Sequence, residues 1–167
     1  MKKTPAKTPA PDRLLLVIMP FGDHREIPRT KASIGPGDCC FDQWFKAMIE
    51  PAGVKAGFRV KRADQELSSG PIFEQFLEDL KDCHAALAFM TGLNPNVMYE
   101  LGIAHALNKP VLLVADSREA LPFDVTHLRF FRYDDAVVDK VGHYQSKLLE
   151  HLRQLLAHPE KAILRSF

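Results

Sequence analysis

The sequence has little net charge and few cysteines. Its 22 lysines and arginines nearly balance its 21 aspartates and glutamates, which leaves a formal net charge of +1 at pH 7. A balanced charge gives no electrostatic reason to expect nucleic acid as a partner. The three cysteines are Cys39, Cys40 and Cys83, and an odd number with one adjacent pair indicates neither a disulfide framework nor the spacing of metal ligands. We therefore expect a cytoplasmic protein without a metal centre.

Long apolar runs are also absent. The longest, Leu14–Met19 and Pro110–Ala115, have the length of strands, whereas a membrane-spanning helix needs about 20 apolar residues. Residues 1–11 hold three lysines and three prolines, and no apolar core of a signal peptide follows them. We expect residues 1–12 to be a flexible N-terminal tail and residues 13–167 to form a single domain with one sizeable core. No contact with a membrane is expected.

The chain does show an alternation of strand and helix patterns. Apolar segments of strand length lie at 14–20, 58–62, 85–90, 110–115 and 128–133. Helical spacing of apolar residues occurs over 41–56, 71–80, 96–107 and 138–157, and Pro51 predicts a kink or break in the first of these helices. The alternation predicts an α/β fold, a doubly wound sheet of about five mainly parallel strands flanked by helices.

One carboxylate stands out at the edge of this sheet where the strands end, the edge at which such folds bind ligands. In the segment that follows the third strand, Asn96 is a suitable N-cap for a short helix. Glu100 is then expected in the first turns of that helix, near its positive end, where a carboxylate tends to stay ionised. Such a group could act as a nucleophile or electrostatic stabiliser. The alternative is a glutamate that stabilises its own helix and faces water.

Other rim loops supply candidate partners for Glu100. Asp64 could offer its carboxylate to a ligand, or would belong to a solvated polar loop. Ser68 and Ser69 could bind phosphate beside the N-terminus of the helix that starts at Pro71, a position suited to anions. Three further candidates follow the first strand: Phe21, Gly22 and Asp23. Gly22 would let a ligand approach the backbone closely, or the three residues would only form the turn that ends the strand.

Two candidates lie beside Glu100 in the sequence. Asn94 could contact a ligand or serve only as a turn or cap residue. Tyr99 has a hydroxyl that could reach the rim, although tyrosine at such a position is more often a packing residue. These residues complete the predicted substrate-binding set.

The segment Thr91–Leu107 resembles the nucleoside 2-deoxyribosyltransferase-like family and its relatives in the TIR-like superfamily. Val17–Gly22 is similar to the first strand and loop of these proteins, and Arg62–Asp64 to their second loop. Pro122–Asp124, followed by Arg129 and Tyr133, is similar to their C-terminal end. The resemblance runs from about Leu14 to Tyr133 and is most specific around Glu100.

The resemblance implies a flavodoxin-like fold and cleavage or transfer at the N-glycosidic bond of a nucleoside or nucleotide. The glutamate at the position of Glu100 would attack the anomeric carbon and displace the base, and the glycosyl group would pass to another base or to water. Asn94 would contact the sugar or phosphate, and Asp64 would hold ribose hydroxyls. This agrees with general chemistry, because an oxocarbenium-like transition state needs a nearby carboxylate. No metal or redox cofactor is required, and a homodimer or higher homo-oligomer is implied.

Two other hypotheses stay open at this point. One is a TIR-like NAD glycohydrolase with NAD as substrate, a possible defence effector. The other is a non-catalytic nucleotide-binding module. Its support is a departure from the family pattern: relatives usually carry an aspartate just before Thr-Gly at the end of the third strand, where this sequence has Phe89 and Met90.

Overall fold

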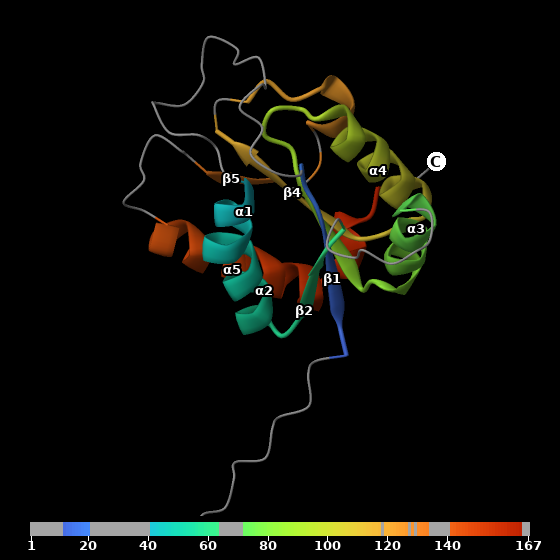
Figure 1. The fold of residues 1–167 in the computed structure, drawn as a ribbon. Coiled ribbons are helices and arrows are strands. Elements are labelled where there is room, and N and C mark those ends of the chain that lie inside the picture. The colour runs from blue at the N-terminus through green and yellow to red at the C-terminus, as the bar shows by residue number, and fades with distance from the viewer. Residues whose placement is uncertain are drawn as a thin grey trace, which may run out of the picture.

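A single parallel sheet forms the centre of the protein. The computed structural model describes residues 12–20, 41–63, 72–117, 119–126, 128, 130–133 and 141–164. Within these ranges, five strands pair in the order β2-β1-β3-β4-β5, and every neighbouring pair is parallel (Figure 1). The strands are β1 (Leu14–Ile18), β2 (Arg59–Arg62), β3 (Ala85–Phe89), β4 (Val111–Asp116) and β5 (Phe130–Tyr133). This is the flavodoxin-like strand order, so the predicted fold class is confirmed.

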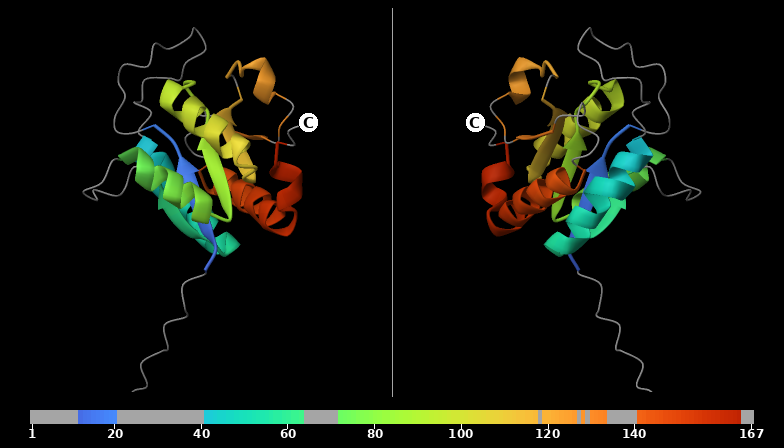
Figure 2. Two further views of the ribbon diagram at one scale, coloured as in Figure 1. Left: turned by 90° about the vertical axis from the view of Figure 1, so that its right-hand side faces the viewer. Right: turned by 90° about the vertical axis from the view of Figure 1, so that its left-hand side faces the viewer.

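Helices cover both faces of the sheet. One face carries α1 (Phe41–Trp44), the π-helical segment η1 (Phe45–Ile49), α2 (Glu50–Ala56) and α5 (Val141–Ala157). The other face carries α3 (Ile72–Asp82) and α4 (Pro95–Ala106), and Figure 2 shows the two sides in turn. Two short 3₁₀ helices complete the described elements, η2 (Phe123–Val125) and η4 (Pro159–Ala162). None of the helices in the described ranges is long and apolar enough to cross a membrane.

The central strands are buried on both faces, which explains their continuous apolar sequences. In β1, Leu15 and Val17 pack into the core beneath α1, α2 and α5. Leu14, Leu16 and Ile18 pack into the opposite core beneath α3 and α4. Successive side chains of a strand point to opposite faces, so both sets must be apolar when helices cover both sides.

The helix that contains Pro51 is irregular, as the sequence predicts. Proline has no N–H to donate to the carbonyl four residues earlier, here that of Ala47. The chain widens into the π-helical segment η1 just before Pro51, and the N–H of Glu50 donates to the oxygen of Phe45. The carbonyl of Ala47 instead accepts a hydrogen bond of 3.1 Å from the side-chain amide of Gln145 on α5. The predicted break is thus a local change of helix type.

Candidate functional site

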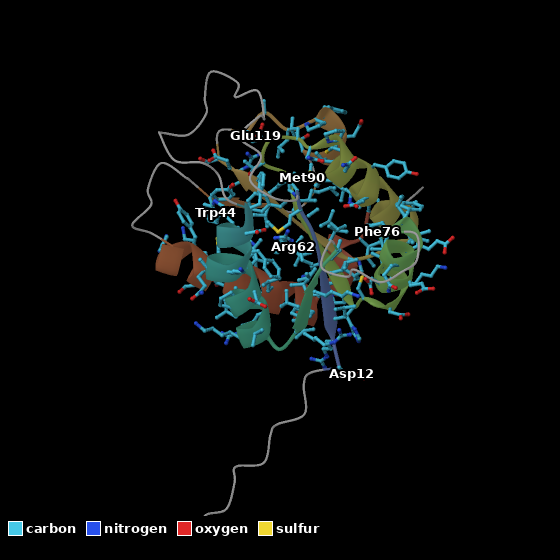
Figure 3. The ribbon with its side chains drawn as sticks, viewed as in Figure 1. Asp12, Trp44, Arg62, Phe76, Met90 and Glu119 are labelled. Carbon is cyan, nitrogen blue, oxygen red and sulfur yellow. The ribbon has the colours of Figure 1, made fainter. Side chains whose placement is uncertain are left out.

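The carboxyl ends of β3, β4 and β5 meet through a network of polar groups. The hydroxyls of Thr91 and Tyr133 lie 2.8 Å apart, and the backbone N–H of Asp116 donates to the Thr91 hydroxyl at 3.0 Å. The backbone N–H of Gly92 donates to Oε2 of Glu119 at 2.9 Å. Thr91 and Asp116 are buried. Figure 3 shows Glu119 beyond Met90, at the end of the molecule toward which the strands run.

A tight turn leads from β3 into α4. The N–H of Leu93 donates to the oxygen of Met90 at 3.0 Å, and Gly92 has a φ of 80°. Leu93 has a φ of 47°, in the left-handed region that a bulky residue seldom adopts. The turn therefore stores backbone strain between the third strand and the helix that carries Glu100.

Asn94, not Asn96, is the N-cap of α4, so that sequence prediction was wrong. The side-chain oxygen of Asn94 accepts the N–H groups of Asn96 and Val97 at 2.9 and 3.3 Å. Pro95 occupies the first helical position, where its fixed φ suits the helix and its missing N–H is not needed. The helix thus begins earlier than Asn96.

The earlier start moves Glu100 into the second turn of α4, because no acidic residue lies in the first turn. The helix dipole contributes less there than in the first turn, since its effect fades beyond that turn. Val97, Leu101 and Ala104 form the buried face of the helix. At about 100° per residue, Glu100 lies roughly 60° from the middle of that face, and it is partly buried. Glu100 thus lies on the flank of α4 that turns toward the sheet.

Tyr99 lies on the opposite side of α4. Its side chain is 64% exposed, and its ring packs 6.0 Å from that of Phe73 on α3. The same helical geometry puts Tyr99 nearly opposite the buried face. Its ring therefore lies on the outer surface of the α3–α4 layer, and a contact between its hydroxyl and the substrate stays a prediction.

Phe89, which stands near the position of the family aspartate, belongs to an aromatic cluster. Its ring lies 5.9 Å from that of Phe41 and 5.7 Å from that of Tyr133. Trp44 of α1 covers this cluster, 4.5 Å from Tyr133 and 6.4 Å from Phe89. Phe89 and its neighbour Met90 are fully buried. The end of β3 is therefore occupied by apolar packing, and Asp116 and Glu119 bring carboxylates to the rim from β4 and the turn after it.

A buried arginine stands at the end of β2. The guanidinium of Arg62 donates a hydrogen bond to Oδ1 of Asp42 and lies 5.6 Å above the ring of Phe45. The hydrogen bond from Arg62 is the main reason why the pKa of the Asp42 carboxyl lies below its ordinary value. This ion pair attaches α1 to the edge of the sheet.

Six of the predicted site residues lie outside the described residues: Phe21, Gly22, Asp23, Asp64, Ser68 and Ser69. Among the residues that are described, no group of three or more His, Cys, Asp or Glu side chains is arranged to hold a metal ion. Asn94 and Glu100 are brought together on one turn-and-helix unit. Sequence reasoning did not single out Glu119, which lies three positions after Asp116 and contacts Gly92, 27 residues away in the sequence.

Comparisons with known proteins agree with this architecture. A structure of a CMP N-glycosidase from Clostridium botulinum has a TM-score of 0.53 at 17% sequence identity, and the match covers 83% of this chain and 99% of that one. A 2-deoxyribosyltransferase from Bacillus psychrosaccharolyticus has a TM-score of 0.51 at 17% identity, with 81% and 95% of the two chains covered. At such identity these likenesses show the fold alone. None of the curated proteins matches the chain.

The family model described as nucleoside 2-deoxyribosyltransferase matches residues 41–154. The match covers more than half of the chain and includes the turn from Thr91, the cap at Asn94 and Glu100. It confirms the expectation of an enzyme. The chain belongs to the nucleoside 2-deoxyribosyltransferase family.

Proposed function

We propose that the protein cleaves or transfers the N-glycosidic bond of a nucleoside or nucleotide, with Glu100 as the essential carboxylate. The observation that carries the proposal is the placement of Glu100. It lies, partly buried, on the sheet-facing flank of a helix whose start is fixed at the carboxyl rim by the Asn94 cap. Ligands of doubly wound folds bind at this rim. Family membership supplies the reaction class.

The reaction requires few groups. A carboxylate oxygen of Glu100 attacks C1′ of the sugar, the bond from C1′ to the base nitrogen breaks, and its electron pair leaves with the base, which takes up a proton. Water or a second base then attacks C1′ and releases the Glu100 carboxylate. If no ester forms, the same carboxylate stabilises the positive charge that develops on the sugar ring. Partial burial strengthens that interaction because there is less water to screen it.

Asn94 is the second residue of the proposed site. Its side-chain oxygen is engaged in the helix cap, so its amide nitrogen is the group that would donate to a sugar hydroxyl or phosphate oxygen. Contacts to ribose and phosphate from Asp64, Ser68, Ser69 and the 21–23 loop remain predictions. So does assembly as a cytoplasmic homodimer.

A non-catalytic nucleotide-binding module is the second candidate, and one observation favours it. Phe89 fills the end of β3 with an aromatic ring that is fully buried. A rim with fewer acidic groups could retain nucleotide binding after catalysis is lost.

One experiment separates these possibilities. The purified protein, a Glu100→Gln variant and a Glu78→Gln control, which changes an exposed glutamate on α3, are incubated with deoxynucleosides, nucleoside monophosphates and NAD. Base release is followed by chromatography. We expect release from a nucleoside or nucleotide by the wild type and the control, and at least a hundredfold slower release by Glu100→Gln. Release of nicotinamide from NAD, with no base released from the nucleosides or nucleoside monophosphates, would instead indicate an NAD glycohydrolase.

Two further outcomes decide between the candidates. Thermal stabilisation by a nucleotide without turnover would support the binding module. Full turnover by Glu100→Gln would refute the role of the carboxylate. Mass spectrometry of the quenched reaction then tests the form of catalysis, because a sugar adduct on the peptide that contains Glu100 identifies a nucleophile.

A further inference from the structure

The hydrogen bonds at the rim form a continuous connection from β5 to the start of α4. Nη1 of Arg132 lies 3.4 Å from the backbone oxygen of Asp116 and 3.5 Å from that of Glu119. The N–H of Glu119 donates to the oxygen of Asp116 at 3.1 Å. These contacts fix the turn after β4. The turn after β4 directs the Glu119 carboxylate to the N–H of Gly92, which belongs to the turn before α4.

The turn before α4 needs such support. Leu93 adopts a positive φ that costs free energy for a branched side chain and persists only where surrounding contacts enforce it. Three contacts do so: the Thr91 hydroxyl with its two partners, the Gly92 N–H with Glu119, and the Asn94 cap. The position of α4, and so of Glu100, follows from the conformation of this turn.

We propose that Glu119 is a positioning residue for the reaction at Glu100. Its carboxylate holds the turn at Gly92 in the conformation that presents Glu100 to the substrate, and it does not itself react. Glu119 comes from a different strand connection than Glu100, so the segment after β4 controls the geometry of the helix after β3. The catalytic part of this inference rests on the proposed function of Glu100.

The test compares two substitutions at Glu119 with a matched control. Glutamine keeps an oxygen that accepts the Gly92 N–H but removes the charge, whereas alanine removes the acceptor. Glu150→Ala removes an exposed carboxylate from α5. We expect Glu119→Ala to lower kcat at least tenfold with KM within about twofold, because small misplacements of a reacting group have large effects on rate. Glu119→Gln and Glu150→Ala should stay within about twofold of the wild type in both constants.

Two results would overturn the proposal. A Glu119→Gln variant as slow as Glu119→Ala would show that the carboxylate itself takes part in the chemistry. A rise in KM at unchanged kcat would show that Glu119 binds substrate instead. A melting temperature for Glu119→Ala within a few degrees of the wild type is part of the expected result, since loss of the fold would lower every rate alike.

Hydrogen exchange tests the effect of the hydrogen bond between Glu119 and Gly92 without any turnover. In peptides that cover residues 90–101, we expect faster exchange in Glu119→Ala than in the wild type, and wild-type protection in Glu119→Gln. Unchanged exchange in Glu119→Ala would refute the positioning of this segment by Glu119, whatever the activity of the variant. If the wild type proves inactive but the exchange difference is present, the proposed function fails while the positioning of α4 by Glu119 stands.

Discussion

Replacing Tyr133 by phenylalanine removes one hydroxyl from the rim network and leaves the ring in place. The hydroxyl lies 2.8 Å from that of Thr91, and Tyr133 is 1% exposed, so water cannot readily replace the lost partner. The ring contacts with Trp44 and Phe89 are kept. A hydrogen bond lost at a buried site destabilises a protein by about 1–2 kcal/mol. For a domain of this size that corresponds to a fall in melting temperature of about 3–6 °C.

Urea unfolding followed by fluorescence suits this measurement, because the sequence has one tryptophan and Trp44 lies 4.5 Å from Tyr133. A double-mutant cycle with Thr91→Val isolates the contact between the two hydroxyls. We expect a coupling free energy of about 1 kcal/mol. Tyr99→Phe is the control: its ring is exposed, so its unfolding free energy should change by less than about 0.5 kcal/mol. Additive effects of Tyr133→Phe and Thr91→Val would refute the proposed network.

Substitutions at three other positions test separate parts of the structure. Asn94→Ala should lower the unfolding free energy by about 1 kcal/mol through loss of the cap, whereas Asn94→Asp keeps the acceptor; equal urea midpoints for the two would contradict the assigned cap. The hydrogen bond from Arg62 lowers the pKa of Asp42 from its ordinary 3.8, so the stability from this pair is present above that pH and is lost as the pH falls through the lowered value. Between pH 6 and pH 2, the melting temperature of Arg62→Met should fall less than that of the wild type. An equal fall in the two proteins would contradict a contribution of this ion pair to stability. Phe89→Asp should lower the unfolding free energy by more than about 5 kcal/mol, since it removes a buried ring and buries a carboxylate. Phe89→Leu is the control and should stay folded by circular dichroism. A folded and more active Phe89→Asp variant would show that the site tolerates the family residue.

The sheet could be predicted from sequence because each central strand is buried on both faces. Residues 85–90 and 110–115 are continuous apolar segments, and the structure places β3 and β4 there with boundaries that differ by one residue. The expected strand at 128–133 is shorter, since β5 begins at Phe130. Ends of strands depend on which backbone groups find a partner, and that is a property of the neighbouring strand.

The candidate site was harder to predict because its contacts are not local. Two residues adjacent in sequence, Tyr99 and Glu100, face different directions because a helix turns by about 100° per residue. The choice between Asn94 and Asn96 as the cap depended on Pro95, which fits the first helical position. No sequence pattern pointed to Glu119, since its contact with Gly92 forms only when the paired strands bring the turn after β4 beside that residue.

The missing family aspartate has a physical explanation in the packing around β3. Phe89 is held between Phe41 and Tyr133, so the end of this strand is shaped for a ring and would bury any carboxylate placed there. The acidic groups at the described rim come instead from the neighbouring strand, where Asp116 ends β4 beside Thr91, and from Glu119 in the turn that follows. Glu119 contacts the turn that precedes α4 through its carboxylate, and Asp116 contacts it through its backbone N–H. In the proposed arrangement, Glu119 therefore acts on the geometry of Glu100 through the backbone of that turn, and the proposed reaction depends on the Glu100 carboxylate.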